Sequence, residues 1–427
     1  MQRERLSGLD QARSIAIIAV VAVHLSFQFP HLPQWATVLA RMGQYGVQLF
    51  FVISAITIFM TLGVDSARYR AASHVAARFY IKRFFRIAPL YYVAILAYGA
   101  MSWYTYRFMP DHASILGQHD AGDILLNLLF MHAVSPSAIN NVVPGGWSIG
   151  VEMLFYSIAP VIFFHATTRA RLLTITAVLL LACAACLSSG ACGGDLPCNV
   201  ENNSFFYFWP PVQVPCFLVG IWCWHFFSPY LSGHAKLGGR GMSLALGMTT
   251  LCTMLAAVCG VWIGLANEYA PVFAACGSAA LLLVFCSEAH QRQTQRQRQR
   301  LVGRIASAVG RESYAIYLWH FLFAFAAIYL FKDSRLLAKH GPVLSLLAFV
   351  VVLAVTLCAS YLLSRLTDKL IQRFASKLAR SLLAKIDLAF AFGRTSPAHA
   401  IAHRGPRPGS GGAPTSRPRA TRAESSA

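Results

Sequence analysis

Ten apolar runs, each long enough to cross a bilayer as a helix, constrain this chain more than any other feature. They lie at roughly 13–30, 45–63, 87–104, 147–165, 172–188, 207–226, 242–263, 271–287, 312–331 and 343–364. A helix needs about 20 apolar residues to span the hydrocarbon core, where every backbone group must be paired. Only 12% of the residues are charged and 56% are hydrophobic, which is too little charge to cover a soluble protein. We therefore expect an all-α, polytopic membrane bundle.

The distribution of lysine and arginine predicts the orientation of this bundle. Cytoplasmic loops carry an excess of these cations. If both termini are cytoplasmic, most cations between the runs lie on the cytoplasmic side, and the exceptions are Arg41, Arg107, Lys332, Arg335 and Lys339. We therefore expect ten helices with both termini inside, in the plasma membrane, which is the inner membrane of a bacterium.

Three regions follow from the order of apolar and polar segments. Residues 1–365 hold the ten runs, and a short apolar segment at 122–134 is typical of a re-entrant or interfacial helix. Residues 366–393 interleave apolar residues with Lys and Arg, which predicts an amphipathic helix at the cytoplasmic membrane surface. Residues 394–427 are dominated by Gly, Pro, Ser, Ala and Arg, so we expect a disordered basic tail. The net charge of +20 is spread along loop edges, which favours contact with lipid headgroups over nucleic acid.

The cysteines and the first run give two further expectations. Most of the 11 cysteines fall inside apolar runs, where cysteine behaves as a small hydrophobic residue. Cys192 and Cys198 bracket a short loop on the expected outer side, which favours a disulfide, and the lack of nearby ligands argues against a metal site. The first run has no small-residue cleavage site, so we expect no signal peptide. We also expect no attached soluble catalytic domain. Any chemistry is then expected in the bundle and its loops.

The first run contains two polar residues that indicate a function. Arg13 opens this run and His24 lies eleven residues later. At about 100° and 1.5 Å per residue, the two side chains share nearly one helix face and lie roughly 16 Å apart along the axis. An ionisable group near the middle of a membrane is costly unless it faces a cavity or a partner. His24 is therefore a candidate catalytic residue, unless a neighbouring helix merely pairs with it, and Arg13 is either functional or a membrane anchor.

A carboxylate and a second histidine lie in later runs. Glu152 is the only carboxylate in its apolar stretch, and it follows Trp147 and Ser148. Such a group needs a partner, and a histidine or arginine on a neighbouring helix is the expected one. His320 ends an aromatic segment and is a second intramembrane histidine.

A basic cluster and two polar residues complete the candidates. Arg83 and Arg86 lie three residues apart, on one side of a helix, with Lys82 adjacent. Paired guanidinium groups suit phosphates, whether of a nucleotide-bearing donor or of lipid, although these cations also suit plain membrane topology. Gln48 and Ser54 of the second run are expected to link helices rather than to react.

Five ordered motifs resemble those of the integral-membrane acyltransferase family 3, whose members O-acylate surface polysaccharides. The motifs run from Leu9 to His24, from Gly46 to Ser54, from Lys82 to Pro89, from Trp147 to Glu152 with Phe155 and Tyr156, and from Ser313 to His320. The likeness covers about residues 6–365. The positions that match the family's functional motifs are Arg13 and His24, Arg83 and Arg86, and Trp147, Ser148 and Glu152.

The resemblance implies transfer of an acyl group, usually acetyl, from cytoplasmic acetyl-CoA to a hydroxyl of an extracytoplasmic carbohydrate such as O-antigen, capsule or exopolysaccharide. Acetyl-CoA would be a co-substrate, with no permanently bound cofactor. The sequence departs from the family at Gln48, where an acidic residue is common, and at Ala55-Ile56, where Gly-Phe is common. Some members carry a periplasmic hydrolase-like domain, so either the bundle acts alone or a periplasmic acyltransferase partner completes the transfer.

Residue types and resemblance together predict roles. The residues expected to bind the phosphates of CoA are Lys82, Arg83 and Arg86. The catalytic candidates are His24 as a base or an acyl carrier, Arg13 as a donor ligand or a stabiliser of negative charge, and Glu152 as a group that orients His24 or the sugar. The substrate-binding candidates are Trp147, Ser148 and His320.

Two other function classes remain open from the sequence. A transporter or exporter of a lipid-linked sugar would use His24 and Glu152 to relay protons, and inverted repeats would support it. No convincing repeat is found. A structural subunit that scaffolds polysaccharide synthesis would leave the buried ionisable groups unexplained.

Overall fold

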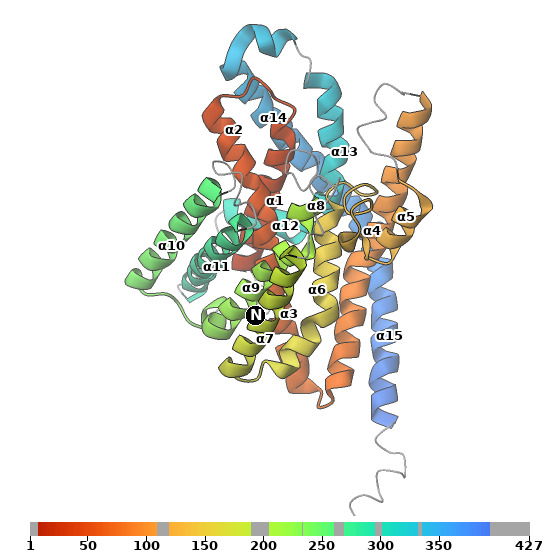
Figure 1. Cartoon of the computed structure of the whole chain (residues 1–427), viewed down its shortest axis with the longest axis vertical. Coiled ribbons are helices and arrows are strands. Elements are labelled where there is room, and N and C mark those ends of the chain that lie inside the picture. Colours follow the sequence, from red (N-terminus) through yellow and green to blue (C-terminus); the bar gives the residue numbers. More distant parts are fainter. Residues whose placement is uncertain are drawn as a thin grey trace, which may run out of the picture.

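The computed structural model describes residues 7–108, 119–188, 205–232, 234–259, 269–294, 301–331 and 335–392, and these residues contain helices and no strand (Figure 1). Cys192, Cys198 and the expected tail lie outside the described residues. The helices are α1 Ser7–Ser26, α2 Gln34–Arg41, η1 Met42–Tyr45, α3 Gly46–Arg68, α4 Ala72–Phe108, α5 Ala121–Leu128, η3 His132–Val134, α6 Gly146–His165, α7 Arg169–Ser188, α8 Phe205–Phe208, α9 Pro210–Leu231, α10 Gly239–Ala257, α11 Ala270–Thr294, α12 Leu301–Arg311, α13 Ser313–Phe331, α14 Arg335–Thr367, the π-helical η6 Asp368–Gln372 and α15 Arg373–Phe392.

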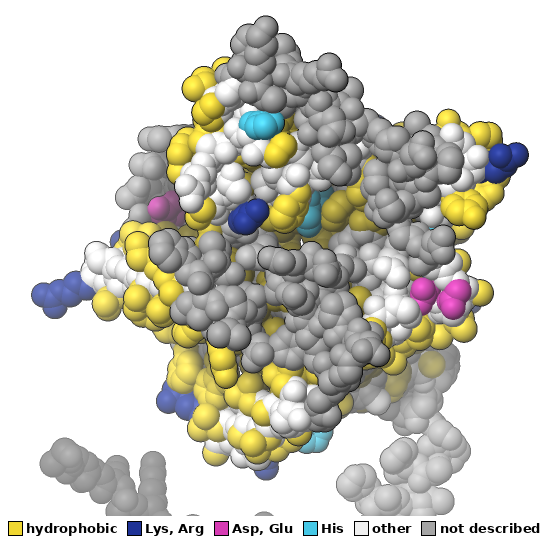
Figure 2. Space-filling model, turned by 45° about the horizontal axis from the view of Figure 1, so that its top comes forward, with side chains coloured by type: hydrophobic (Ala, Val, Ile, Leu, Met, Phe, Trp, Pro, Cys, Tyr) yellow, Lys and Arg dark blue, Asp and Glu magenta, His cyan; other side chains and the backbone are white. Residues whose placement is uncertain are grey.

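The prediction of an all-α polytopic membrane bundle is confirmed. Eight stretches of helix among the described residues are long and apolar enough to cross a membrane. A shorter apolar helix at Ser313–Ala327 matches the expected run at 312–331, and α10 matches the run at 242–263 without being one of the eight. The count of ten crossings and the side on which the termini lie stay predictions. Figure 2, which brings the top of Figure 1 forward, shows hydrophobic side chains over much of the described surface, with charged side chains and histidines scattered among them.

Helix α4 positions the basic cluster. It is one continuous helix of 37 residues, with Pro89 inside it, and it starts well before the apolar run expected at 87–104. Residues 82–86 are therefore held on a long helix rather than on a flexible loop. One side of this helix carries Arg83 into the bundle, while Phe84 points outward and is exposed.

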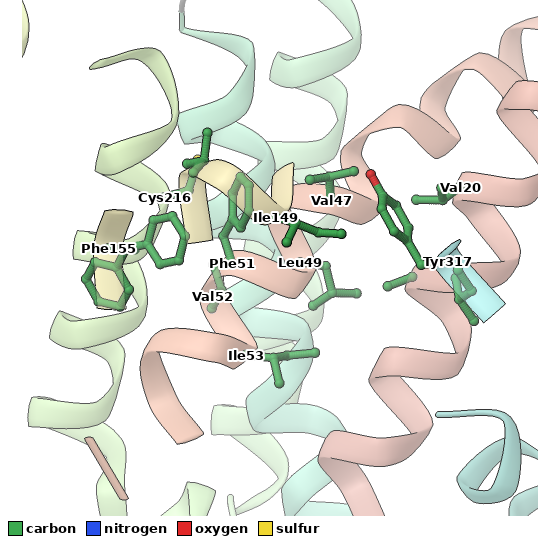
Figure 3. Close-up of a cluster of buried hydrophobic side chains, with 14 of the residues drawn as sticks. Val20, Val47, Leu49, Phe51, Val52, Ile53, Ile149, Phe155, Cys216 and Tyr317 are labelled. Atoms are coloured by element: carbon green, nitrogen blue, oxygen red, sulfur yellow. The ribbon is translucent and has the colours of Figure 1, made fainter. Parts of the chain in front are cut away.

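Helix α3 lies at the centre of the hydrophobic core (Figure 3). Its Phe51 stacks on Phe217 of α9 with ring centroids 4.6 Å apart, and Phe155 of α6 stacks on the same ring at 4.2 Å. Figure 3 shows Val20 of α1 and Tyr317 of α13 on the other side of α3. Because α3 is fixed between these helices, the polar residues along it have defined neighbours.

Glycines let the helices approach closely. A methyl group at Gly46 would lie 2.5 Å from the carbonyl oxygen of Ala16, and one at Gly43 would overlap the carbonyl of Ala19. The tightest contact is between α12 and α1, where a methyl group at Gly310 would overlap the carbonyl of Asp10. Close approach of backbones through small residues is a common way to pack membrane helices.

Replacing Gly310 by alanine is expected to destabilise the bundle, because the added methyl group forces α12 away from α1. Overpacking of this kind costs about 1–3 kcal/mol. A clear fall in the melting temperature of the detergent-solubilised protein would show it. Gly247→Ala is the matched control, since a methyl group at that helical position meets no atom within 4 Å. Equal melting temperatures for the two variants would contradict the packing described.

The segment expected to be an amphipathic helix is α15. It continues from α14 through the short π-helical segment and packs along the N-terminal half of α4 (Figure 1). Gln372 donates a hydrogen bond to the carbonyl oxygen of Arg86, and Asp387 pairs with Arg78 near the start of α4. The two helices therefore run antiparallel. Its place at the membrane surface stays a prediction.

Candidate functional site

A cavity of about 80 Å³ opens among α1, α3, α4, α6 and α13. Apolar and polar side chains line this cavity. The polar ones are Arg13, Ser54, Thr57, Arg83, Arg86, Ser148, Glu152, Tyr156, Ser313, Tyr314 and Tyr317. Five of the residues singled out from the sequence meet here, although they come from three separate helices. The structure thus brings together Arg13, Arg83, Arg86, Ser148 and Glu152.

The arginines make one side of this cavity strongly positive. Arg13 is held by Asp10, which lies one helical turn earlier at 2.9 Å. Arg83 is buried between two rings, with its guanidinium carbon 5.6 Å from the centre of Phe79 and 5.4 Å from that of Tyr156. Arg86 is exposed, and of the cations lining the cavity it is the most accessible to solvent. Three guanidinium groups around one cavity suit a ligand with several phosphate charges.

Among the described residues, Glu152 is the one carboxylate that lines the cavity, and its partners are hydroxyl groups. Ser54 of α3 donates a hydrogen bond to Glu152 Oε1 at 2.5 Å, and Tyr156 donates to the same oxygen at 2.6 Å. The expected partner was a histidine or an arginine, and the expected role included orienting His24. The structure shows neither contact, because His24 lies further along α1 and is engaged elsewhere.

The partner of His24 is His320. Nδ1 of His24 lies 2.9 Å from Nε2 of His320, and Nδ1 of His320 lies 2.7 Å from the carbonyl oxygen of Tyr317. His320 is fully buried, whereas His24 is half-buried. Phe321 packs against both imidazole rings, with centroids 4.4 Å from His24 and 4.2 Å from His320.

This chain of contacts defines the tautomer of both neutral histidines. A carbonyl oxygen only accepts, so Nδ1 of His320 carries the hydrogen and its Nε2 offers a lone pair. Nδ1 of His24 must then donate to His320. The remaining nitrogen of His24, Nε2, is left with a free lone pair, which is the form that a base or a nucleophile needs.

Tyr317 connects the histidine pair with the cavity. Its carbonyl oxygen accepts from His320, while its hydroxyl lies in the cavity wall, 2.8 Å from Ser148 Oγ and 2.8 Å from the carbonyl oxygen of Gly145. Neither His24 nor His320 lines the cavity. Arg13 thus lines the cavity and His24 does not, although the sequence placed both on one helix face. Tyr317 of α13 lines the cavity as well, and its carbonyl oxygen contacts His320, the partner of His24.

The loop before α6 fixes this hydroxyl pair from the other side. Gly145 has a left-handed backbone, with φ of 76°, and its N–H donates to Asn140. His132 contacts the carbonyl oxygen of Gly146 through Nε2 at 2.9 Å, and burial lowers the pKa of His132 to about 4. A methyl group at Gly150 would lie 2.7 Å from His132 Nε2. The segment expected as a re-entrant or interfacial helix thus forms α5 and η3, which support the start of α6.

Besides His24 and His320, two predicted site residues lie apart from the cavity. Lys82 forms an ion pair of 2.5 Å with Asp65 of α3 and does not line the cavity. Trp147 stacks on Phe208 with centroids 4.6 Å apart and meets the edge of Phe51, so it packs behind the wall that Ser148 lines. The structure gives Lys82 and Trp147 structural partners.

Sequence reasoning missed several residues of the site. Tyr156, Tyr314 and Tyr317 line the cavity, and Ser54, expected only to link helices, donates to Glu152. Helical spacing contained a signal for two of them, since Tyr156 follows Glu152 by four residues and Tyr317 precedes His320 by three. Gln48 does link helices, because its amide donates to Gln213 of α9 at 2.9 Å.

Fold and site together define a multi-pass membrane protein with a cationic cavity beside a buried histidine pair. Residues 6–365 match the family model described as an acyltransferase domain. The chain therefore belongs to this acyltransferase family, as its motifs suggested.

Individual relatives are distant. Peptidoglycan O-acetyltransferase OatA of Listeria monocytogenes is 25% identical over 346 residues, which cover 75% of this chain and 49% of that protein. Putative peptidoglycan O-acetyltransferase YrhL of Bacillus subtilis is 24% identical over 354 residues, or 74% of this chain and 48% of that protein. A putative acetyltransferase of Acidianus two-tailed virus is 25% identical over 224 residues, 52% of this chain and 58% of that protein. The chain spans about half the length of the first two curated relatives. No solved structure matches it significantly.

Proposed function

We propose that this chain is a membrane O-acetyltransferase, which moves an acetyl group from cytoplasmic acetyl-CoA to a hydroxyl of an extracytoplasmic carbohydrate. The observation that carries the proposal is the pairing of a cavity lined by three arginines with a histidine whose Nε2 is free to accept a proton. Membership of the acyltransferase family supports the reaction class. The plasma membrane is the proposed location.

Arg83, Arg86 and Arg13 are proposed to bind the phosphates of the donor. Charge-assisted bonds from arginine to phosphate are about twice as strong as neutral hydrogen bonds, and the described lining of the cavity holds one carboxylate to oppose them. Lys82 has no part in this scheme, because Asp65 neutralises it. The thioester arm then extends from the arginines toward Ser148 and Tyr317.

His24 is proposed to act at the reacting end. As a general base, its Nε2 takes the proton of the accepting hydroxyl while the hydroxyl oxygen bonds to the acetyl carbonyl carbon. The carbon–sulfur bond breaks, and the CoA thiolate leaves and takes up a proton. In the second variant that the sequence left open, Nε2 first accepts the acetyl group and then passes it to the sugar. In both, His320 holds His24 in the required tautomer.

The acceptor is proposed to be a cell-surface glycan. Two relatives bear the name peptidoglycan O-acetyltransferase, which favours a polymeric carbohydrate over a small molecule. Peptidoglycan therefore joins O-antigen, capsule and exopolysaccharide as a candidate. If membranes that contain this protein alone transfer no acetyl group to the glycan, we propose that a periplasmic acyltransferase partner completes the last step.

The transporter hypothesis loses its main support. It requires a proton path between His24 and Glu152, yet His24 contacts His320 while Glu152 contacts Ser54 and Tyr156. The two ionisable groups belong to separate hydrogen-bond networks.

Membranes that contain the protein and are supplied with radiolabelled acetyl-CoA are expected to label the extracted glycan fraction. His24→Ala is expected to reduce this label at least about 100-fold, the usual contribution of a general base. His165→Ala is the matched control, because His165 is exposed at the end of α6 and contacts its own helix. Label that stays in CoA in all three membranes, while glycan export depends on the protein, would refute the enzyme and restore the transporter.

A further inference from the structure

Helix α15 presents two parallel stripes to the surroundings of the bundle. The apolar stripe continues at every fourth residue from α14 into α15, and its members are Leu362, Leu366, Leu370, Phe374 and Leu378, which are 43–70% exposed. The basic stripe runs beside it and consists of Lys369, Arg373, Lys377 and Arg380, all exposed. Residues three and four apart share one side of a helix, so each set forms a continuous edge.

The opposite side of α15 is fixed to α4. Asp387 contacts His74 at 2.8 Å and pairs with Arg78 at 2.5 Å, and Phe390 stacks flat on the ring of His74 at 4.3 Å. Ala375 is buried on this inner side. The inner face is occupied, whereas the two stripes are not covered by any residue that the structure describes.

The charge of α15 needs an anionic partner. Five cations and two carboxylates lie between residues 366 and 392, and one of those carboxylates, Asp387, is engaged by α4. Within the described part of the chain, no ion pair forms with any cation of the basic stripe, whereas Arg365 just before it pairs with Glu312. A hollow of about 320 Å³ lies along the stripe, lined by Asp368, Gln372, Arg373, Ser376, Lys377 and Arg380. Three cations against one carboxylate leave the hollow positive.

The position of the stripes indicates that lipid is the partner. The apolar stripe prolongs the exposed face of α14, and both helices belong to the stretch Gly341–Ala391, which is long and apolar enough to include a membrane span. Lys369 follows the end of the apolar run by five residues, about 7 Å along the helix axis, which is the depth of one headgroup layer. Acyl chains can therefore lie on the apolar stripe while a headgroup phosphate meets the basic stripe.

We propose that the outer face of α15 is a binding surface for anionic phospholipid, which holds α15 against α4 beside the arginine cluster. This surface lies outside the cavity and does not depend on the acetyltransferase proposal. Each cation near an anionic membrane surface contributes roughly a fivefold gain in affinity.

The test is amide hydrogen exchange of the full chain in nanodiscs. Discs of phosphatidylcholine alone are compared with discs that contain phosphatidylglycerol as well. We expect the phosphatidylglycerol to slow exchange in residues 373–392 at least about fivefold. The combined variant Lys369→Gln/Arg373→Gln/Lys377→Gln/Arg380→Gln is expected to remove this difference. Equal exchange of wild type in both kinds of disc would overturn the proposal.

Three controls keep the outcome specific. Arg169→Gln/Arg171→Gln/Lys236→Gln/Arg240→Gln removes the same charge elsewhere and is expected to keep the lipid effect. Arg373→Lys/Arg380→Lys keeps the charge and is expected to keep it too, which guards against misfolding of the combined variant. Inorganic phosphate added to phosphatidylcholine discs is expected to have no effect. Protection by phosphate alone would replace the lipid by a free anion and refute the surface as proposed.

Discussion

Replacing Arg83 and Arg86 together by alanine is expected to raise the KM for acetyl-CoA by about 10²- to 10⁴-fold. Two charge-assisted contacts to phosphate are lost, each worth about 1.5–3 kcal/mol. Arg83 is buried between Phe79 and Tyr156, so part of the loss is also packing. Initial rates of transfer in membranes, measured over a range of donor concentrations, give the KM directly.

Lys82→Ala supplies the discriminating comparison. Because Lys82 pairs with Asp65 rather than lining the cavity, its loss is expected to change the KM for acetyl-CoA less than about threefold, the range of an ion pair that solvent reaches. If Lys82→Ala raised the KM for acetyl-CoA as much as the arginine variant does, all three cations would bind the phosphates of the donor. The cavity described here, which Lys82 does not line, would then not be the donor site.

Replacing His320 by alanine is expected to lower kcat about 100-fold while the KM for acetyl-CoA stays within about twofold. The variant removes the acceptor of the His24 Nδ1 hydrogen, so the neutral ring no longer favours the form with a free Nε2 lone pair. His320 acts through His24 and does not line the donor cavity, which is why the effect falls on kcat.

His320→Gln is the variant that separates positioning from simple packing. Its amide has both an acceptor for His24 and a donor for the carbonyl of Tyr317, so a partial recovery of kcat is expected. A structural role alone predicts that Gln and Ala behave alike and that both lower the melting temperature. That pattern would contradict the tautomer mechanism.

The sequence predicted the helices of this fold well, because bilayer thickness imposes a length and a hydropathy that are visible in the chain. It also singled out five residues that line the cavity, since a buried arginine or glutamate in a membrane helix needs a special environment, and their roles stay predictions. Arg13, Arg83 and Glu152 are examples. Long-range pairing was beyond reach: His24 and His320 are 296 positions apart, and no periodicity links them.

Two contacts differ from those expected, for the same reason. Lys82 looked equivalent to its neighbours Arg83 and Arg86, yet the orientation of α4 turns it toward Asp65, a residue with no signal of its own in the sequence. Glu152 was assigned an ionic partner because the sequence could not show that Ser54 and Tyr156 converge on one oxygen. Interhelical geometry, and not residue type, decides such partners.

The carbonyl oxygen of Gly145 receives hydrogen bonds from two hydroxyls, those of Ser148 and Tyr317, while the N–H of the same residue donates to Asn140. Gly145 thus joins the loop before α6 to α13, the helix that carries His320. Both bonds break together if this loop moves, so the two elements respond as a single cooperative unit. The carbonyl oxygen of Tyr317 also accepts from His320 Nδ1, so a displacement of this loop that shifts Tyr317 also disturbs the hydrogen bond that sets the tautomer of the histidine pair.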